Sequence, residues 1–148
     1  MIHKKRRDEL LSKLGVDALI IVSSNSEQKR NSDVNYPFRP DSSFWYLTGF
    51  IEPDAVAVFS KHGYSIFLRP KDKTKEIWNG LRLGVELAPE TLLADQAYNI
   101  DSIFNELPSL ISKYSKVYFD TPSEGGWKDF SSTNIINSKI EGLVKNKL

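Results

Sequence analysis

Residues 55–70, AVAVFSKHGYSIFLRP, constrain the fold more than any other stretch of the chain. Two runs rich in branched and aromatic residues flank the short sequence KHG, and this pattern predicts two strands joined by a tight turn. Strands joined in this way pair antiparallel. Two further runs, DALIIVSS at 17–24 and KVYFD at 116–120, also read as strands, and helix-like sequence lies before the second one. The sequence therefore predicts an α/β fold with a mixed sheet.

Residues 2–14 predict a surface helix with one apolar stripe that ends at Gly15. The residues of this stripe are Ile2, Arg6, Leu10 and Leu14, with Leu11 beside them. Residues 24–43 form a long polar loop that contains proline, and residues 72–80 predict a short helix with Asp72 as its N-cap. The sequence thus predicts one helix before the hairpin, at residues 2–14, and one directly after it, at residues 72–80.

Residues 100–114 predict a helix whose apolar side chains lie on one face. Those side chains are Ile103, Leu107, Leu110, Ile111 and Tyr114. Asp101 or Ser102 is expected to cap this helix, and Pro108 is expected to kink or split it. A turn at 121–126 and a last amphipathic helix at 132–148 complete the predicted order.

The composition is that of one soluble globular domain spanning residues 1–148. The formal net charge is +1, so no overall field attracts the chain to nucleic acid or to an anionic membrane. The sequence has no cysteine, no apolar stretch of transmembrane length and no secretory signal. We therefore expect a cytoplasmic protein without nucleic-acid or membrane partners. The basic run KKRR near the N-terminus is interpreted as a solvated helix face, because two acidic residues follow it at once.

No catalytic or metal-ligating motif is present. The two histidines, His3 and His62, have no second histidine or carboxylate pair at the spacing of a metal site. The nucleophile elbow, the phosphate-binding loop and the dinucleotide fingerprint are all missing. Glu52 and Asp54 are interpreted as turn and capping residues. The residues alone thus predict no catalytic residue, no metal and no cofactor in this chain.

Six of the seventeen aromatic residues fall between Tyr36 and Phe50. A short helix that begins near Asp41 and ends at Thr48-Gly49 would place Phe44 and Leu47 on one side. A nucleic-acid surface would need basic residues interleaved with the rings, and few are near. We therefore expect this stretch to form a corner of the core.

Two blocks of sequence resemble a known family. The first holds S-D, Y-P-F-R, S-x-F-W-Y-L-T-G-F and E-P in order within residues 32–53, and the second is E-I-W-x-G-x-R-x-G at residues 76–84. Both resemble the N-terminal domain of Xaa-Pro aminopeptidase, also called aminopeptidase P. One departure is Leu81, where many relatives carry a second arginine.

The resemblance implies a creatinase-like N-terminal domain with a mixed sheet of roughly six strands flanked by helices. It also implies a catalytic pita-bread domain downstream, with two divalent metals, usually manganese, held by two Asp, one His and two Glu. In that family the N-terminal domain breaks no bonds. It lies beside the metal cleft, limits the entry of proline-containing peptides and mediates assembly into a homo-dimer or homo-tetramer.

The resemblance also suggests which residues touch substrate. Trp78 would reach toward a peptide cleft or simply pack on the sheet, and Arg82 would contact a peptide or pair with Glu76. Asp33, Tyr36 and Arg39 are expected to fasten the long loop, with a buried pair between the aspartate and the arginine. Two alternatives stay open: a prolidase-type dipeptidase, and a metal-free relative that only binds peptides.

Overall fold

The computed structural model describes residues 2–24, 29–31, 34–35, 42–73, 76–77 and 82–120. The predicted turn at 121–126, the predicted helix at 132–148 and most of the loop at 24–43 lie outside these residues. The elements are α1 (Ile2–Leu14), β1 (Ala18–Ser23), β2 (Lys29–Asn31), β3 (Val34–Asn35), α2 (Ser42–Thr48), β4 (Val56–Ser60), β5 (Gly63–Leu68), α4 (Gly84–Leu92), β6 (Gln96–Asn99), the 3-10 turn η1 (Ile100–Ser102), α5 (Ile103–Ser112) and β7 (Lys116–Asp120).

The predicted mixed sheet is confirmed. Its strand order is β6-β5-β4-β1-β7, and β4 runs antiparallel to both of its neighbours while β1 pairs parallel with β7 and β5 pairs parallel with β6. The hairpin of β4 and β5 turns at residues 61–62, as its sequence predicts. The described residues give this sheet five strands, where the family resemblance implied about six.

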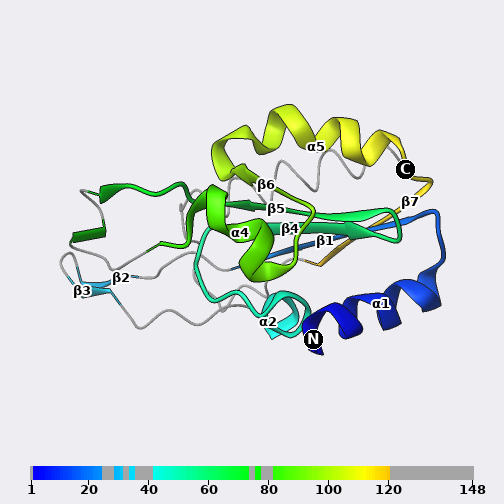
Figure 1. Cartoon of the computed structure of the whole chain (residues 1–148), viewed down its shortest axis with the longest axis horizontal. Coiled ribbons are helices and arrows are strands. Elements are labelled where there is room, and N and C mark those ends of the chain that lie inside the picture. Colours follow the sequence, from blue (N-terminus) through cyan, green and yellow to red (C-terminus); the bar gives the residue numbers. More distant parts are fainter. Residues whose placement is uncertain are drawn as a thin grey trace.

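Helices cover both faces of the sheet, which is why β1 and β4 are buried along their whole length. On one face Leu19, Val58 and Phe67 lie against α5. Residues one position away in the same strands, such as Ile20 and Phe59, face the side that holds α1, α2 and α4. Figure 1 shows α5 on one side of the sheet and α1 with α2 on the other. The result is a three-layer α/β fold.

Helix α1 has the predicted bounds but buries a different side. Ile2 is exposed, and the two buried residues are Arg7 and Leu11, while Leu10 and Leu14 pack at the edge of the core. The predicted stripe was wrong by one position, because Arg7 and not Arg6 occupies the central buried place.

Between the hairpin and α5, one helix and one strand were not predicted. Helix α4 contains Pro89, and the short strand β6 has exposed or half-buried side chains along its length. In α4, Pro89 interrupts the helical spacing of Val85, Ala88 and Leu92, and β6 has no alternation of buried and exposed residues, so neither element was recognised.

Helix α5 buries the predicted face, but its ends differ from the prediction. Asn99 caps the preceding 3-10 turn by accepting from the Asp101 N–H, and Ser102 makes no side-chain cap bond. The helix continues through Pro108 without splitting.

Strands β1 and β5 end at the same edge of the sheet, because they run in the same direction (Figure 1). The segment 24–55 leaves this edge after β1 and the segment 69–83 leaves it after β5. Part of the first segment, predicted as a loop, forms the small antiparallel ribbon β2–β3. Both sequence blocks that carry the family resemblance therefore belong to the segments that follow β1 and β5 at this edge, and the carboxyl ends of strands are where α/β sheets commonly place their sites.

Candidate functional site

The aromatic stretch folds as predicted where the structure describes it. Phe44 and Leu47 of α2 are buried, and Phe50 joins them in the core. Trp45 and Tyr46 are about half exposed on the other side of the helix. Thr48 fastens the end of α2, since its hydroxyl donates to the Phe44 carbonyl (2.7 Å) and accepts from the Phe50 N–H (3.1 Å). Most of this stretch is thus core, and two rings remain on the surface.

Three basic side chains of α1 hold the carboxyl end of α2. Arg7 donates to the Leu47 carbonyl oxygen at 2.7 Å, and Arg6 donates to the Tyr46 carbonyl oxygen at 3.2 Å. The Nδ1 atom of His3 lies 3.1 Å from the same Tyr46 oxygen. The last carbonyl groups of a helix have no partner within it, and the partial negative charge there favours cations. These contacts tie the N-terminal helix to the aromatic corner.

Arg7 is almost fully buried, at 4% exposed, and its guanidinium lies 4.2 Å from the centre of the Tyr64 ring. Burial lowers the pKa of Arg7, and the neighbouring Tyr64, Asp8 and Asp95 oppose that change. Burial likewise raises the pKa of Tyr64 to about 12, although the cation of Arg7 acts in the other direction. At both groups, therefore, the loss of solvent changes the pKa more than the neighbouring charges do.

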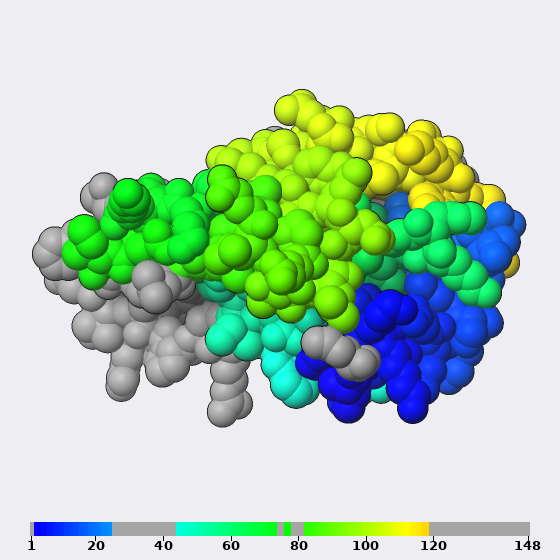
Figure 2. Space-filling model, viewed as in Figure 1, coloured from blue at the N-terminus to red at the C-terminus, as the bar shows by residue number. Residues whose placement is uncertain are grey.

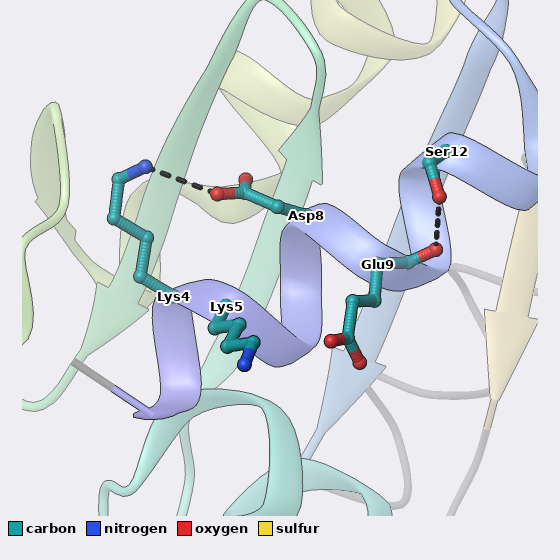
Figure 3. A pocket seen from close by; sticks show the side chains of 5 residues that line it. All are labelled: Lys4, Lys5, Asp8, Glu9 and Ser12. Atoms are coloured by element: carbon teal, nitrogen blue, oxygen red, sulfur yellow. Dashed lines mark hydrogen bonds and ion pairs between the residues drawn. The ribbon is translucent and has the colours of Figure 1, made fainter.

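The interpretation of KKRR as a solvated face is right for its first half and wrong for its second. Lys4 and Lys5 are exposed, and Figure 3 shows Lys4 and Asp8 pointing toward each other across one turn, with 3.1 Å between Nζ and Oδ2. Arg6 lies over the Tyr46 ring and Arg7 is buried. The signal that could have revealed this is the helical spacing of Arg7 and Leu11, which puts them on one face.

At the carboxyl edge of the sheet, the motif residue Glu52 joins two segments that are distant in sequence. Its Oε2 accepts the Leu83 N–H at 2.7 Å, and its Oε1 accepts from Arg69 Nη2 at 3.4 Å. Both side chains of the ion pair are mostly buried. Glu52 therefore does more than shape a local turn, whereas Asp54 adopts the left-handed conformation (φ 57°) of a turn residue.

Glu76 makes a second bond of the same kind. Its Oε1 accepts the Arg82 N–H at 2.7 Å, and the Arg82 guanidinium turns instead to the Pro70 carbonyl oxygen at 3.1 Å. The predicted pairing of Arg82 with Glu76 thus exists through the backbone and not through the guanidinium. We call Glu52, Glu76, Arg69–Lys71 and Arg82–Gly84 the loop base, because they lie where the segment 72–81 leaves and rejoins the fold.

Gly84 completes the loop base. It has a φ of 81°, and a Cβ atom there would lie 2.6 Å from Cγ of Lys71. The stem of Lys71 therefore crosses the glycine closely, and its Nζ reaches to 3.8 Å from Glu76 Oε1. Only glycine meets both requirements at little cost.

The remaining predicted site residues, Trp78, Asp33, Tyr36 and Arg39, lie outside the described residues. Trp78 belongs in sequence to the segment that the loop base encloses. Within the described parts of the chain, no group of three or more His, Cys, Asp or Glu could hold a metal ion.

A cleft of about 500 Å³ opens at the opposite, amino edge of the sheet. It lies between the β4–β5 turn and the end of α5, a region where Figure 2 shows a hollow between the two. His62, Asp95 and Tyr114 line it, and the hydroxyl groups of Tyr114 and Ser60 lie 2.7 Å apart. None of the described residues of the two family blocks lines this cleft, so the loop base remains the candidate site.

The strand order and the helices on both faces of the sheet define a three-layer α/β domain, and comparison with known proteins identifies its family. The family model for the aminopeptidase P N-terminal domain matches residues 3–118, and the chain belongs to this family. The Xaa-Pro aminopeptidase of Haemophilus influenzae is 39% identical over 130 residues, which cover 85% of this chain and 30% of that protein. The Xaa-Pro aminopeptidase of Escherichia coli is 37% identical over 147 residues, which cover 96% of this chain and 32% of the relative.

A solved structure agrees with these matches. The aminopeptidase PepP of Pseudomonas aeruginosa superposes with a TM-score of 0.80 at 30% identity, over 99% of this chain and 33% of that one. The chain thus spans about a third of the length of the relatives it matches, and it corresponds to their N-terminal domain. Among the described residues no helix is long and apolar enough to cross a bilayer.

Proposed function

We propose that this chain is the non-catalytic N-terminal domain of a metallo-aminopeptidase that removes the residue preceding an N-terminal proline. In this proposal it shapes and caps a substrate cleft whose metal ligands lie in a separate catalytic domain. The observation that carries the proposal is the match of the aminopeptidase P N-terminal domain over residues 3–118. In the loop base, Glu52 of the first family block binds the backbone of the second block at Leu83.

The substrate gives a physical reason for such a domain. The bond before proline has no N–H, and the proline ring fixes φ, so recognition as an ordinary extended strand loses a hydrogen bond. A wall that holds a short peptide end in register then contributes through proximity and orientation. Segments projecting from the carboxyl edge of the sheet suit this role, because a rigid scaffold positions them.

Two manganese ions are proposed for the catalytic domain, and the described residues do not fit that role. They offer no ligand cluster, so this chain is expected to bind manganese no better than any exposed carboxylates. Titration of the 148-residue chain with Mn²⁺ by calorimetry checks this expectation. Tight, stoichiometric binding would contradict the division of labour proposed here.

The function itself is tested on the full-length gene product that contains these residues. We expect Mn-dependent release of the first residue from a tripeptide of the form Xaa-Pro-Yaa, and no release by the 148-residue chain alone. An enzyme that accepts dipeptides but rejects tripeptides would be a prolidase-type dipeptidase instead. Binding of the peptide without any release would indicate a metal-free peptide-binding relative.

Assembly and location are further proposals. We expect the full-length protein to form a homo-dimer or homo-tetramer in the cytoplasm, because the family resemblance implies assembly through this domain. Light scattering measures the oligomeric state of the full-length protein and of the protein without residues 1–148, and the comparison tests whether this domain mediates assembly. An unchanged oligomeric state after removal would refute the assembly role.

A further inference from the structure

We propose that the cleft at the amino edge of the sheet binds a small zwitterion with an apolar body, the chemistry of a free amino acid or a dipeptide. Every residue that lines this cleft is described by the structure. Its volume of about 500 Å³ lies within the range of small-molecule sites, about 300–1,000 Å³. This binding does not rest on the proposed function.

The cleft forms where the face of the sheet under α5 changes from apolar to polar side chains. Because side chains alternate between the two faces of a sheet, residues two positions apart in a strand share a face. The apolar layer beneath α5 includes Leu19 of β1, Val58 of β4, Phe67 of β5 and Tyr98 of β6. Two positions nearer to the amino edge, the chain carries Asp17, Ser60, Ser65 and Gln96, which all line the cleft. The apolar floor therefore ends in polar groups at this edge.

The wall of the cleft on the side of α5 is held by hydrogen bonds. Helix α5 ends at Ser112, and Lys113 and Tyr114 follow it at the cleft. The Tyr114 hydroxyl lies 2.7 Å from the Ser60 Oγ, which also accepts the His62 N–H at 3.0 Å. Figure 2 shows the hollow that remains between α5 and the β4–β5 turn. Since protein interiors rarely leave spaces larger than a water molecule, this bounded opening suits a ligand.

Charged side chains of both signs line the cleft without pairing with one another. Asp17, Asp95 and Lys113 all lie along it, and no ion pair joins them in the described part of the chain. The Asp95 carboxylate is oriented by β5, because its Oδ2 accepts the Tyr64 N–H at 2.7 Å. No other described residue binds its Oδ1. Opposite charges that are held apart in this way complement a ligand that carries both charges.

Each part of such a ligand has a counterpart in the cleft. We assign the ligand ammonium group to Asp95, the ligand carboxylate to Lys113 and the apolar body to the floor that Leu19, Val58 and Leu110 form. A simple anion would meet two carboxylates, and a simple cation would meet the lysine, so the zwitterion is favoured over both. The peptidase reaction proposed above would release molecules of this class.

The test is a nuclear magnetic resonance titration of the 148-residue chain with leucine and, separately, with the dipeptide Leu-Leu. We expect saturable shifts of the His62, Gly63 and Asp95 amides, with a Kd of millimolar order for the better ligand. The comparison of the two ligands determines whether one residue or two separate the charges. Two analogues of leucine supply the ligand controls: 4-methylpentanoate lacks the ammonium group, and 3-methylbutylamine lacks the carboxylate. Each should bind at least about threefold more weakly than leucine or the dipeptide.

Variants test the same two contacts from the side of the protein. Asp95→Asn keeps an oxygen that can accept the Tyr64 N–H, and Lys113→Met keeps an unbranched side chain. Each should weaken binding about threefold to tenfold, as expected for one charged contact that is open to solvent. The matched controls are Lys61→Met in the β4–β5 turn and Glu106→Gln on α5, two exposed positions that do not line the cleft. Neither control should change the Kd.

The amides of β1 report whether each variant remains folded, and the analogues test the contacts without altering the protein. The absence of saturable shifts at the cleft with both leucine and Leu-Leu, up to tens of millimolar, would overturn the proposal. Equally tight binding of 4-methylpentanoate would overturn the zwitterion in favour of an apolar anion. Folded Asp95→Asn and Lys113→Met proteins that bind as tightly as the natural chain would refute the assigned contacts. A full-length protein without Xaa-Pro activity would refute the proposed function and leave these binding results unaffected.

Discussion

Arg7 offers the sharpest test of how this domain is held together, because its neighbour Arg6 is a natural control. Both arginines lie on α1, donate to carbonyl groups at the carboxyl end of α2 and stack on a tyrosine ring at 4.2 Å. They differ in solvent exposure: Arg7 is buried and Arg6 is only partly covered. The perturbation is therefore Arg7→Ala compared with Arg6→Ala.

The expected loss for Arg7→Ala is about 2–3 kcal/mol in the free energy of unfolding. A hydrogen bond from a charged donor is worth about 1.5–3 kcal/mol, and a desolvated cation–π contact adds about 0.5–2 kcal/mol. Part of this sum is offset, because the variant no longer buries a charge, a cost that is visible in the lowered pKa of Arg7. For Arg6→Ala we expect less than about 1 kcal/mol, since solvent competes for both of its contacts.

Urea unfolding of the 148-residue chain, followed by far-ultraviolet circular dichroism, measures both values. The slope of the unfolding free energy against urea concentration should be the same in the two variants, so that their unfolding midpoints can be compared directly. If the two variants differ by less than about 0.5 kcal/mol, burial does not decide the contribution of these arginines and the reasoning fails. A more stable Arg7→Ala variant would show that the desolvation cost exceeds all of the contacts.

Three further outcomes follow from single contacts. Because burial raises the pKa of Tyr64 to about 12 from an ordinary value of 10.0, the unfolded chain loses this proton first as pH rises, so stability should fall by about 2–3 kcal/mol between pH 10 and 12. Tyr64→Phe should remove that loss without a penalty at pH 7, because the buried Tyr64 hydroxyl has no hydrogen-bond partner among the described residues. A steep alkaline loss of stability in this variant, measured by urea unfolding, would contradict the assignment. Gly84→Ala should cost about 1–2 kcal/mol through its positive φ and its contact with Lys71, and Lys71→Ala in the same chain should recover only the steric part in thermal melts. Thr48→Val should cost about 1–3 kcal/mol by leaving the Phe50 N–H unbonded, while Thr48→Ser should stay close to the natural stability.

The elements predicted correctly are those in which local chemistry and burial agree. The strands of the hairpin at 55–70 are rich in branched and aromatic residues, and a turn that contains glycine joins them. The apolar residues of α5 recur with a helical period. Each pattern therefore fits only one type of secondary structure. The segment 84–99 lacks such agreement. Its helix contains a proline and its strand is short and half exposed, and only pairing with β5 makes it a strand. Non-local pairing of this kind has no local signal.

The candidate site was harder to predict for a related reason. Sequence patterns draw attention to side chains that contact other side chains, and they suggested a pairing of Arg82 with Glu76. The contacts found here join side chains to backbone groups: Glu76 and Glu52 to amide N–H groups, and Arg82 to a carbonyl oxygen. Every residue offers the same backbone groups, so no residue type marks the partner. The buried Arg7 was missed in the same way, because its partner is a carbonyl oxygen at the end of a helix.

The use of backbone groups also bears on how such a domain tolerates change. A side chain that binds a backbone N–H keeps its contact when the residue carrying that N–H is replaced, provided that the chain path is kept. Position 83 can therefore vary while Glu52 holds it, whereas position 84 cannot, since its φ of 81° and the Lys71 stem both require glycine. The same logic applies within 77–81: if the loop base fixes the ends, substitutions such as the one at Leu81 should change what the segment presents and leave its anchorage intact. Leu81→Arg should accordingly leave the exchange of the Arg82 and Leu83 amides unchanged, and faster exchange there would show that the anchorage depends on the residues it encloses.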